Sequence, residues 1–306
     1  IPECGLSRCG PDGCGGSCGE CPVGWECTPI IGYCAPPPCR EVITEWFPAG
    51  VVNSLSFPTS TAEMQGCVDY TDDGDVDDGM MVMTSTLTKW ANGFIDTADP
   101  AFILEFAGYS TGIGQQNFTL NVFAGEPTTP GRLGGQMYVD YDSYDSSTSC
   151  GAYVSFYPAN VISNTLYAGP IAVTLVIPIS EELALAIHPG DVLITAVVDV
   201  GENGVSSTDG VMSGIVYREE YLHILDMFAT ECAKDPVPEG VVQTCPNLAQ
   251  FQEHAETMFD IHATEDGAYI APDAEHPANA ASFCAKFKLA PATIIGFTPP
   301  QWMDGR

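Results

Sequence analysis

The chain has 306 residues, 45% of them hydrophobic, which suffices for one large domain or two ordinary ones. Forty Asp and Glu oppose nine Lys and Arg, so the formal net charge is −31 at pH 7. This surface excludes nucleic acid and anionic lipid as partners, because phosphate binding needs a basic footprint. The carboxylates also repel one another, so bound divalent cations would stabilise the compact state. Solubility in salty surroundings is the alternative explanation of the acidity.

Residues 1–39 are predicted to form a small disulfide-rich module. They lack apolar periodicity, so covalent cross-links must replace a core. Pro36, Pro37 and Pro38 predict a stiff connector to the next domain. Cys39 either completes the module as an eighth partner or pairs into that next domain. The seven cysteines before it are Cys4, Cys9, Cys14, Cys18, Cys21, Cys27 and Cys34.

The chain has thirteen cysteines in all, which predicts an oxidising compartment and a secreted, extracellular or cell-surface protein. The first residue is Ile1, so we expect that a leader or pro-segment has been removed. The longest apolar runs are interrupted by Pro178, Pro189 and Asp191, and we therefore expect no transmembrane segment.

Residues 40–306 are predicted to form a mainly β domain, an antiparallel β-sandwich with a few short helices. Short segments rich in Val, Ile, Thr, Phe and Tyr alternate with turn residues, which is typical of that class. The expected strands are 101–107, 117–124, 136–141, 152–157, 171–179, 183–187, 192–200, 211–217, 282–289 and 292–297.

Three segments show helical spacing of apolar residues instead: 79–91, 218–230 and 247–262. The cysteines of this domain are Cys67, Cys150, Cys232, Cys245 and Cys284, of which the last three are expected to cross-link the C-terminal region. Five is an odd number, so a bond from Cys39 into this domain would complete three pairs.

An Asp-rich loop, residues 69–78, is the sharpest local signal for a ligand. It places Asp69, Thr71, Asp73 and Asp77 at positions 1, 3, 5 and 9 of a calcium loop, and Gly74 at position 6. Ca²⁺ takes six to eight hard oxygen ligands, and glycine lets the chain turn back to deliver them. The predicted ligands are Asp69, Thr71, Asp73, Asp75, Asp77 and Asp78.

Position 12 of this loop is Met80 rather than a bidentate Glu, so Asp78 or a distant carboxylate would have to complete the shell. A solvated acidic turn is the alternative interpretation. Weaker acidic groups occur at Asp140, Asp142 and Asp145, at Glu265 and Asp266, and at Asp273 and Glu275.

Two motifs resemble those of known exported proteins. The Cys/Gly-rich run at 9–27 resembles modules of secreted and lipid-anchored proteins of myxobacteria-like bacteria. The string at 66–78 resembles the loop that opens the β-rich domain of those proteins, and 281–287 resembles its closing strand. The group is largely uncharacterised, so the resemblance implies an exterior location and calcium rather than an activity.

Other patterns indicate chemistry less well. Gly108–Gly112 matches G-x-S-x-G around Ser110, but a strand rather than a helix is expected next, so no catalytic residue is predicted. His254, Met258 and His262 lie at helical spacing, and core packing explains them better than a metal does.

The sequence therefore favours a non-enzymatic, calcium-stabilised structural or adhesive surface protein, with self-assembly into a surface layer or filament as one form of that role. Its partners would be copies of itself, other surface proteins or glycans. The alternatives are a carbohydrate-binding module that uses Trp25, Trp46 and Trp302, and a serine hydrolase.

Overall fold

The structure is a computed structural model of the whole chain. It describes residues 26–27, 34–35, 43, 45–98, 100–110, 117–140, 143–145, 150–178, 184–238, 241–242, 245–255, 257–264 and 266–298. Most of the predicted 1–39 module, including Cys39, lies outside the described residues. Within it, β1 (Glu26–Cys27) pairs antiparallel with β2 (Cys34–Ala35).

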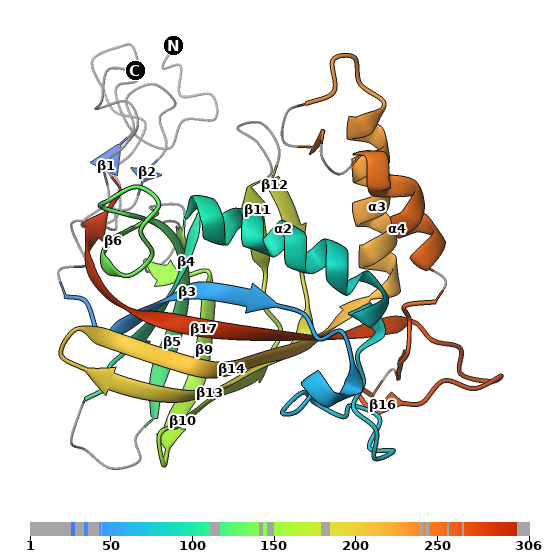
Figure 1. Cartoon of the computed structure of the whole chain (residues 1–306), viewed down its shortest axis with the longest axis horizontal. Helices are drawn as coiled ribbons and strands as arrows, with labels where there is room; N and C mark the ends of the chain where they lie inside the picture. Colours follow the sequence, from blue (N-terminus) through green and yellow to red (C-terminus); the bar gives the residue numbers. More distant parts are fainter. Residues whose placement is uncertain are drawn as a thin grey trace, which may run out of the picture.

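The main body is a sheet whose strand order closes on itself (Figure 1). Its order is β14-β13-β10-β9-β5-β4-β3-β17, and β14 also pairs antiparallel with β17, which completes a ring of eight strands. These strands are β3 (Ala49–Ser56), β4 (Ala101–Ala107), β5 (Asn117–Pro127), β9 (Val154–Ile162), β10 (Thr165–Ile171), β13 (Gly190–Gly201), β14 (Gly204–Tyr217) and β17 (Ala280–Phe297).

The mainly β, antiparallel class is confirmed, whereas the expected sandwich is not formed. A sandwich requires two sheets, and here the long pairing of β14 with β17, from Tyr217↔Ala280 to Ser207↔Leu289, joins the two ends of one sheet. Closure removes the exposed edges that an open sheet would leave. The strands therefore form a closed barrel.

A ninth strand, β6 (Gly135–Val139), creates a second and smaller ring. It pairs parallel with β17 and antiparallel with β5, so that β5, β4, β3, β17 and β6 also close. The strands shared by the two rings, β5, β4, β3 and β17, have a hydrophobic cluster on each face of the sheet. On β4, Leu104 and Phe106 enter the main core, while Ala101 and Ile103 enter the second. Burial on both faces explains why β4 reads as a continuous apolar run.

Three α-helices and three 3₁₀ turns accompany the strands in the described chain. The turn η2 (Gly79–Met83) leads into α2 (Thr84–Thr97), which lies alongside β3. Helices α3 (Arg218–Cys232) and α4 (Leu248–His254) stand together at one end of the barrel (Figure 1). Tyr221 and Leu225 of α3 are buried in the main core. The remaining short elements are η1 (Thr61–Glu63), β7 (Tyr144–Asp145), β8 (Gly151–Ala152), β11 (Leu175–Pro178), β12 (Ala184–Ile187), η5 (Cys245–Asn247), β15 (His262–Ala263) and β16 (Tyr269–Ile270).

The expected helix over 247–262 is too long. It ends at His254, because Ile261 instead pairs with Ala280: the amide of each bonds the carbonyl of the other, at 3.2 and 3.1 Å. The two closing strands expected at 282–289 and 292–297 form the single strand β17, and the strand expected at 171–179 is divided between β10 and β11. The sequence signals gave no indication of β3.

All five cysteines of residues 40–306 form disulfides. Cys67 bonds Cys284, and Cys232 bonds Cys245. Cys150 is disulfide-bonded as well. The expectation that Cys284 serves the C-terminal cross-links is therefore wrong, since it is joined to a residue next to the Asp-rich loop. No helix in the described ranges has the length and hydropathy of a membrane span.

Candidate cation site at the Asp-rich loop

The Asp-rich loop is held against the outer surface of the barrel beside β14 and β17. The Cys67–Cys284 disulfide fixes its entrance to β17. Tyr70 then packs with its ring edge toward Tyr269, 5.6 Å between centroids, and its hydroxyl donates to the carbonyl of Asp191 at 3.2 Å. Tyr70 also contacts a small apolar cluster around Ile215. The loop is thus anchored by a covalent bond and by a contact between two half-buried aromatic rings.

Hydrogen bonds within the loop turn several carboxylates inward. Asp69 Oδ2 accepts from the amide of Gly74 at 2.9 Å, and Gly74 has a φ of +96°, which favours glycine. Asp77 Oδ2 accepts from the amides of Tyr70 and Thr71 at 2.6 and 3.0 Å. These bonds close the loop, and they occupy the Asp77 carboxylate, which was predicted to be a ligand.

The exit of the loop packs directly against residues 258–260. A Cβ added at Gly79 would lie 1.9 Å from the carbonyl oxygen of Met258 and 2.6 Å from Asp260 Oδ1, so only glycine fits there. The Gly79 amide donates to Ser282 Oγ at 3.0 Å, and Ser282 Oγ donates to Asp260 Oδ2 at 2.6 Å. Asp260 is therefore held close to the end of the Asp-rich loop, although 182 positions separate it from Asp78 in the sequence.

Asp78 is the most perturbed carboxyl of this cluster. Both of its side-chain oxygens are buried without a hydrogen-bond partner of good geometry in the described structure, and Asp69 Oδ1 is in the same condition. Burial raises the pKa of Asp78 to about 7, and the Asp260 carboxylate adds to the rise, while the nearby Cys284 amide opposes it. A carboxylate buried in this way needs either a proton or a cation.

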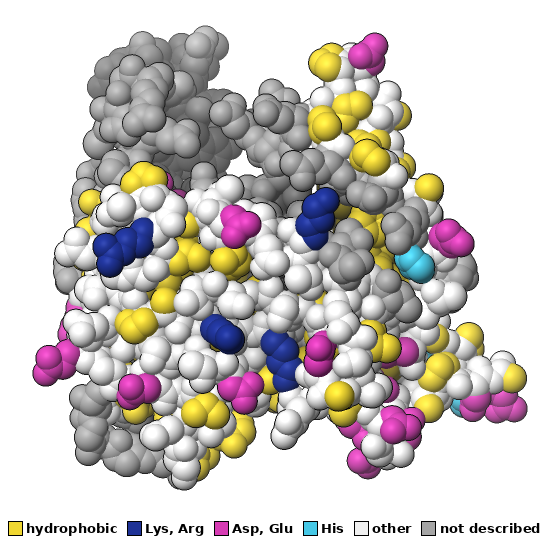
Figure 2. All heavy atoms as spheres, in the orientation of Figure 1, with side chains coloured by type: hydrophobic (Ala, Val, Ile, Leu, Met, Phe, Trp, Pro, Cys, Tyr) yellow, Lys and Arg dark blue, Asp and Glu magenta, His cyan; other side chains and the backbone are white. Residues whose placement is uncertain are grey.

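The neighbouring carboxyls are shifted in the same direction. Burial raises the pKa of Asp260, which Asp77 raises further, against the effect of the Ser282 bonds. Burial likewise raises the pKa of Asp77, with contributions from Asp69 and Asp73. The acidic groups thus destabilise each other's charged forms, and no Lys or Arg contributes to any of these three shifts. Figure 2 shows acidic side chains gathered at this corner of the molecule.

The predicted ligands are only partly brought together. Asp73 and Asp75 are exposed, and Thr71 Oγ1 lies 3.4 Å from both oxygens of Asp77. Among the described residues, no group of three or more His, Cys, Asp or Glu side chains is arranged to hold a metal ion. The unpartnered oxygens of Asp69 and Asp78 nevertheless match the hard donor set of Ca²⁺. Asp260 is the residue that the loop motif missed, and its only sequence signal was an acid between apolar neighbours.

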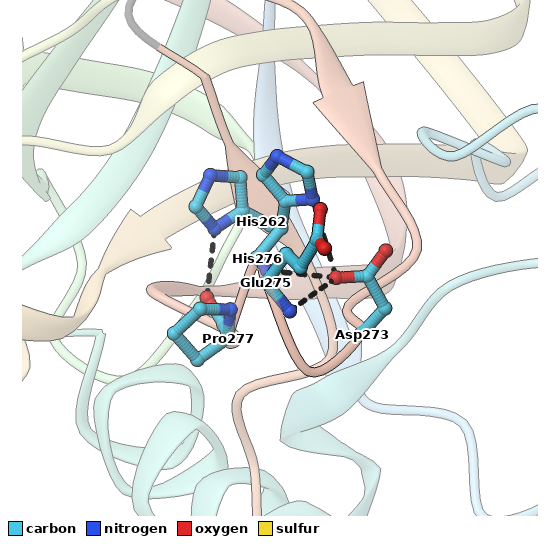
Figure 3. A network of polar contacts seen from close by, with 5 residues as sticks. All are labelled: His262, Asp273, Glu275, His276 and Pro277. Carbon is cyan, nitrogen blue, oxygen red and sulfur yellow. Dashed lines mark hydrogen bonds and ion pairs between the residues drawn. The ribbon is translucent and has the colours of Figure 1, made fainter.

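The weaker acidic groups have other roles where they are described. Asp273 accepts from the amides of Glu275 and His276, at 2.8 and 2.7 Å, and so caps a turn (Figure 3). The same turn brings the ring of His276 to 5.3 Å from that of His262, whose Nδ1 donates to the carbonyl of Pro277 at 2.7 Å. Asp140 Oδ1 accepts from the hydroxyl of Thr298. Asp142 and Glu265 lie outside the described residues.

The patterns associated with other chemistry are dispersed by the fold. Met258 is fully buried, and His254 ends α4 while His262 lies in β15, so the His/Met stripe does not share a helix. Ser110 is exposed just beyond β4, and the next described element is strand β5. Trp46 is half-buried against Phe123 and Phe297, with centroids 6.4 and 5.3 Å away, and is not free to stack on a sugar. Trp25 and Trp302 lie outside the described residues.

Comparisons with known proteins add no assignment. Neither protein-family models, nor curated proteins, nor solved structures give a match to this chain.

Proposed function

We propose that the chain is a non-enzymatic extracellular protein with a structural or adhesive role, whose surface loops are stabilised by calcium. The observation that carries the proposal is a pair of carboxyls, Asp78 and Asp260, whose pKa values are both raised by burial. The Asp260 carboxylate adds to the rise at Asp78, and no cationic side chain is among the causes of either shift. A folded chain that holds such groups at neutral pH gains stability from a bound divalent cation.

Asp260 would supply what the loop motif lacks. Met80 occupies the position of the bidentate ligand, and the structure brings the Asp260 carboxylate to the adjacent end of the loop. Asp69 Oδ1 and the two Asp78 oxygens are the other donors without partners. A cation held by these residues would join the Asp-rich loop to residues 258–260, at the place where Cys67–Cys284 already joins it to β17.

The disulfides support a location outside the cell. Cys67–Cys284 and Cys232–Cys245 form, and Cys150 is also bonded, which is expected in an oxidising compartment. A closed barrel whose surface segments are fixed by disulfides suits a protein that must stay folded outside the cell, where chaperones are absent. The proposal includes the resemblance of the Cys/Gly-rich run and the Asp-rich loop to exported proteins of myxobacteria-like bacteria.

Thermal unfolding with and without calcium tests the proposal. We expect millimolar Ca²⁺ to raise the melting temperature of the full chain and EDTA to reverse the gain. Asp78→Asn and Asp260→Asn should each abolish the calcium response, whereas Asp209→Asn, at an exposed position on β14, should preserve it. Calorimetric titration of the EDTA-treated protein gives a second readout, independent of stability. Equal melting temperatures in calcium and EDTA, together with no heat of binding, would contradict the proposal.

A further inference from the structure

One long segment of this highly charged chain has no charge at all. Between Asp145 and Glu181 the sequence contains no Asp, Glu, Lys or Arg, although the whole chain has 40 acidic and nine basic residues. The described part of this segment includes β9 and β10, which are neighbours in the barrel wall, and β10 pairs on its other side with β13. It is the longest uncharged run of the chain, although β3 and residues 117–125 of β5 are uncharged as well.

The outward side chains of these strands are apolar and exposed. On β9 and β10, the inward residues Phe156, Ala159, Leu166 and Ala168 are buried in the main core. The residues on the other face are Tyr157, Ile162 and Tyr167, joined by Val197 of β13, and they are 67%, 43%, 45% and 53% exposed. We call these four residues the neutral face. Tyr153, just before β9, is 57% exposed and extends it.

The strand register places Ile162, Tyr167 and Val197 of the neutral face next to one another. Thr165 of β10 is the partner of both Ile162 and Val197, so these three form one row across three strands. Tyr167 lies in the next row on the same side, between Asn160 and Thr195. Side chains in neighbouring rows on one face of a sheet lie within reach of each other. Two exposed acids adjoin the neutral face: Asp209 of β14 is the register partner of Val197, and Asp199 follows Val197 by two residues on β13.

This arrangement has the anatomy of a protein interface. Interface cores are depleted of charge and enriched in Tyr, with a polar rim. The exposed parts of the five side chains amount to several hundred Å², and with a rim they approach the roughly 800 Å² per partner of a standard interface.

We propose that the neutral face is where a second copy of this chain docks. Each copy has a net charge of −31, so contact through most of the surface would bring carboxylates together and cost electrostatic free energy. Contact through the neutral face avoids most of this repulsion. The exposed Ile162 and Val197 favour a protein partner over a glycan, because sugar rings stack on aromatic faces and gain little from aliphatic ones. The inference rests on the structural role proposed above, although it does not depend on calcium.

The test is the mass of the full chain in solution, measured by sedimentation equilibrium from micromolar to near-millimolar protein. Association should strengthen as NaCl is raised from about 10 to about 150 mM, because the screening length falls from about 30 to about 8 Å and the long-range repulsion weakens. An interface built on ion pairs would show the opposite dependence on salt.

Two variants localise the contact. Tyr157→Glu, at the most exposed position of the face, should weaken association at least about tenfold. Leu222→Glu adds the same charge at a 39% exposed apolar residue of α3 and should leave association unchanged. Melting temperatures check that both variants fold.

Three results would overturn the inference. They are a monomer under all conditions, association that Tyr157→Glu does not affect, and equal weakening by both variants. A monomer that binds insoluble neutral polysaccharide through Tyr157 would reassign the face to a glycan. None of these results depends on EDTA, so the inference can fail while the calcium proposal stands, and the reverse also holds.

Discussion

Replacing Asp78 by Asn should stabilise the cation-free protein above neutral pH. The substitution keeps the shape of the side chain and removes a charge whose oxygens are both buried without partners. Burial raises the pKa of Asp78 from 3.8 to about 7 in the folded chain. Below pH 3.8 the group is protonated in both the folded and unfolded states and contributes nothing. As the pH rises toward 7, the unfolded chain ionises first, so stability is lost across this window and stays lost above it.

The size of the effect follows from the pKa. A carboxyl moved from 3.8 to about 7 corresponds to about 4 kcal/mol in full. Asp78 as a residue is only half-buried, so solvent screening reduces the expected penalty to about 1–2 kcal/mol. For a domain of this size that corresponds to a melting temperature about 2–6 °C higher for Asp78→Asn than for the wild type at about pH 8 in EDTA.

Urea unfolding in EDTA at several pH values measures this difference. The wild type and Asp78→Asn should converge near pH 4 and diverge toward pH 8, and added Ca²⁺ should reverse their order by stabilising the wild type alone. Asp209→Asn serves as the matched control, because this exposed acid should change neither curve. If Asp78→Asn is less stable than the wild type at pH 8 in EDTA, or if the difference is independent of pH, the buried charge is not the cause and the reasoning is refuted.

Two further predictions concern the framework. Glu105 is 4% exposed and accepts hydrogen bonds from the Phe47 amide at 3.1 Å and from Asn121 Nδ2 at 3.0 Å. Glu105→Ala should therefore lower the free energy of unfolding in urea by about 2–3 kcal/mol, and Glu105→Gln should lower it clearly less. Equal losses of unfolding free energy in the two variants would contradict a role for these hydrogen bonds. Removing Cys67–Cys284, which closes a separation of 217 residues, should cost about 5 kcal/mol, against about 3 kcal/mol for Cys232–Cys245 with its separation of 13. The reverse order in matched Cys→Ser pairs would show that loop closure does not govern their contributions.

Local patterns predicted most of the strands and helices. The expected strand at 101–107 coincides with β4, and the helix expected at 218–230 is α3 with two more residues. Alternation and helical spacing report which side of an element is buried, and that is a property of a few consecutive residues. The same patterns misjudged 255–261, where Met258 and Phe259 are buried against the barrel although they do not belong to a helix.

The candidate site divides in the same way. The Asp-rich loop was recognisable because its oxygens and Gly74 follow one another at fixed spacing. Asp260 was not recognisable from the sequence, because it is a single acid between Phe259 and Ile261. It joins the acidic residues of the loop only through the pairing of Ile261 with Ala280. The neutral stretch between Asp145 and Glu181 was readable in the sequence, but only the register of β9, β10 and β13 placed Ile162 and Val197 in one row.

The sequence by itself therefore determined the β-rich class, the acidity, the use of disulfides and the Asp-rich loop. Only the tertiary structure decided that the sheet closes, that Cys67 bonds Cys284, and that Asp260 lies beside the end of the Asp-rich loop. The physical reason is that each of these depends on contacts between residues that are far apart in the chain. β14 could end a sheet or close one with equal local propensity, and it is the packing of the whole core that selects β17 as its partner.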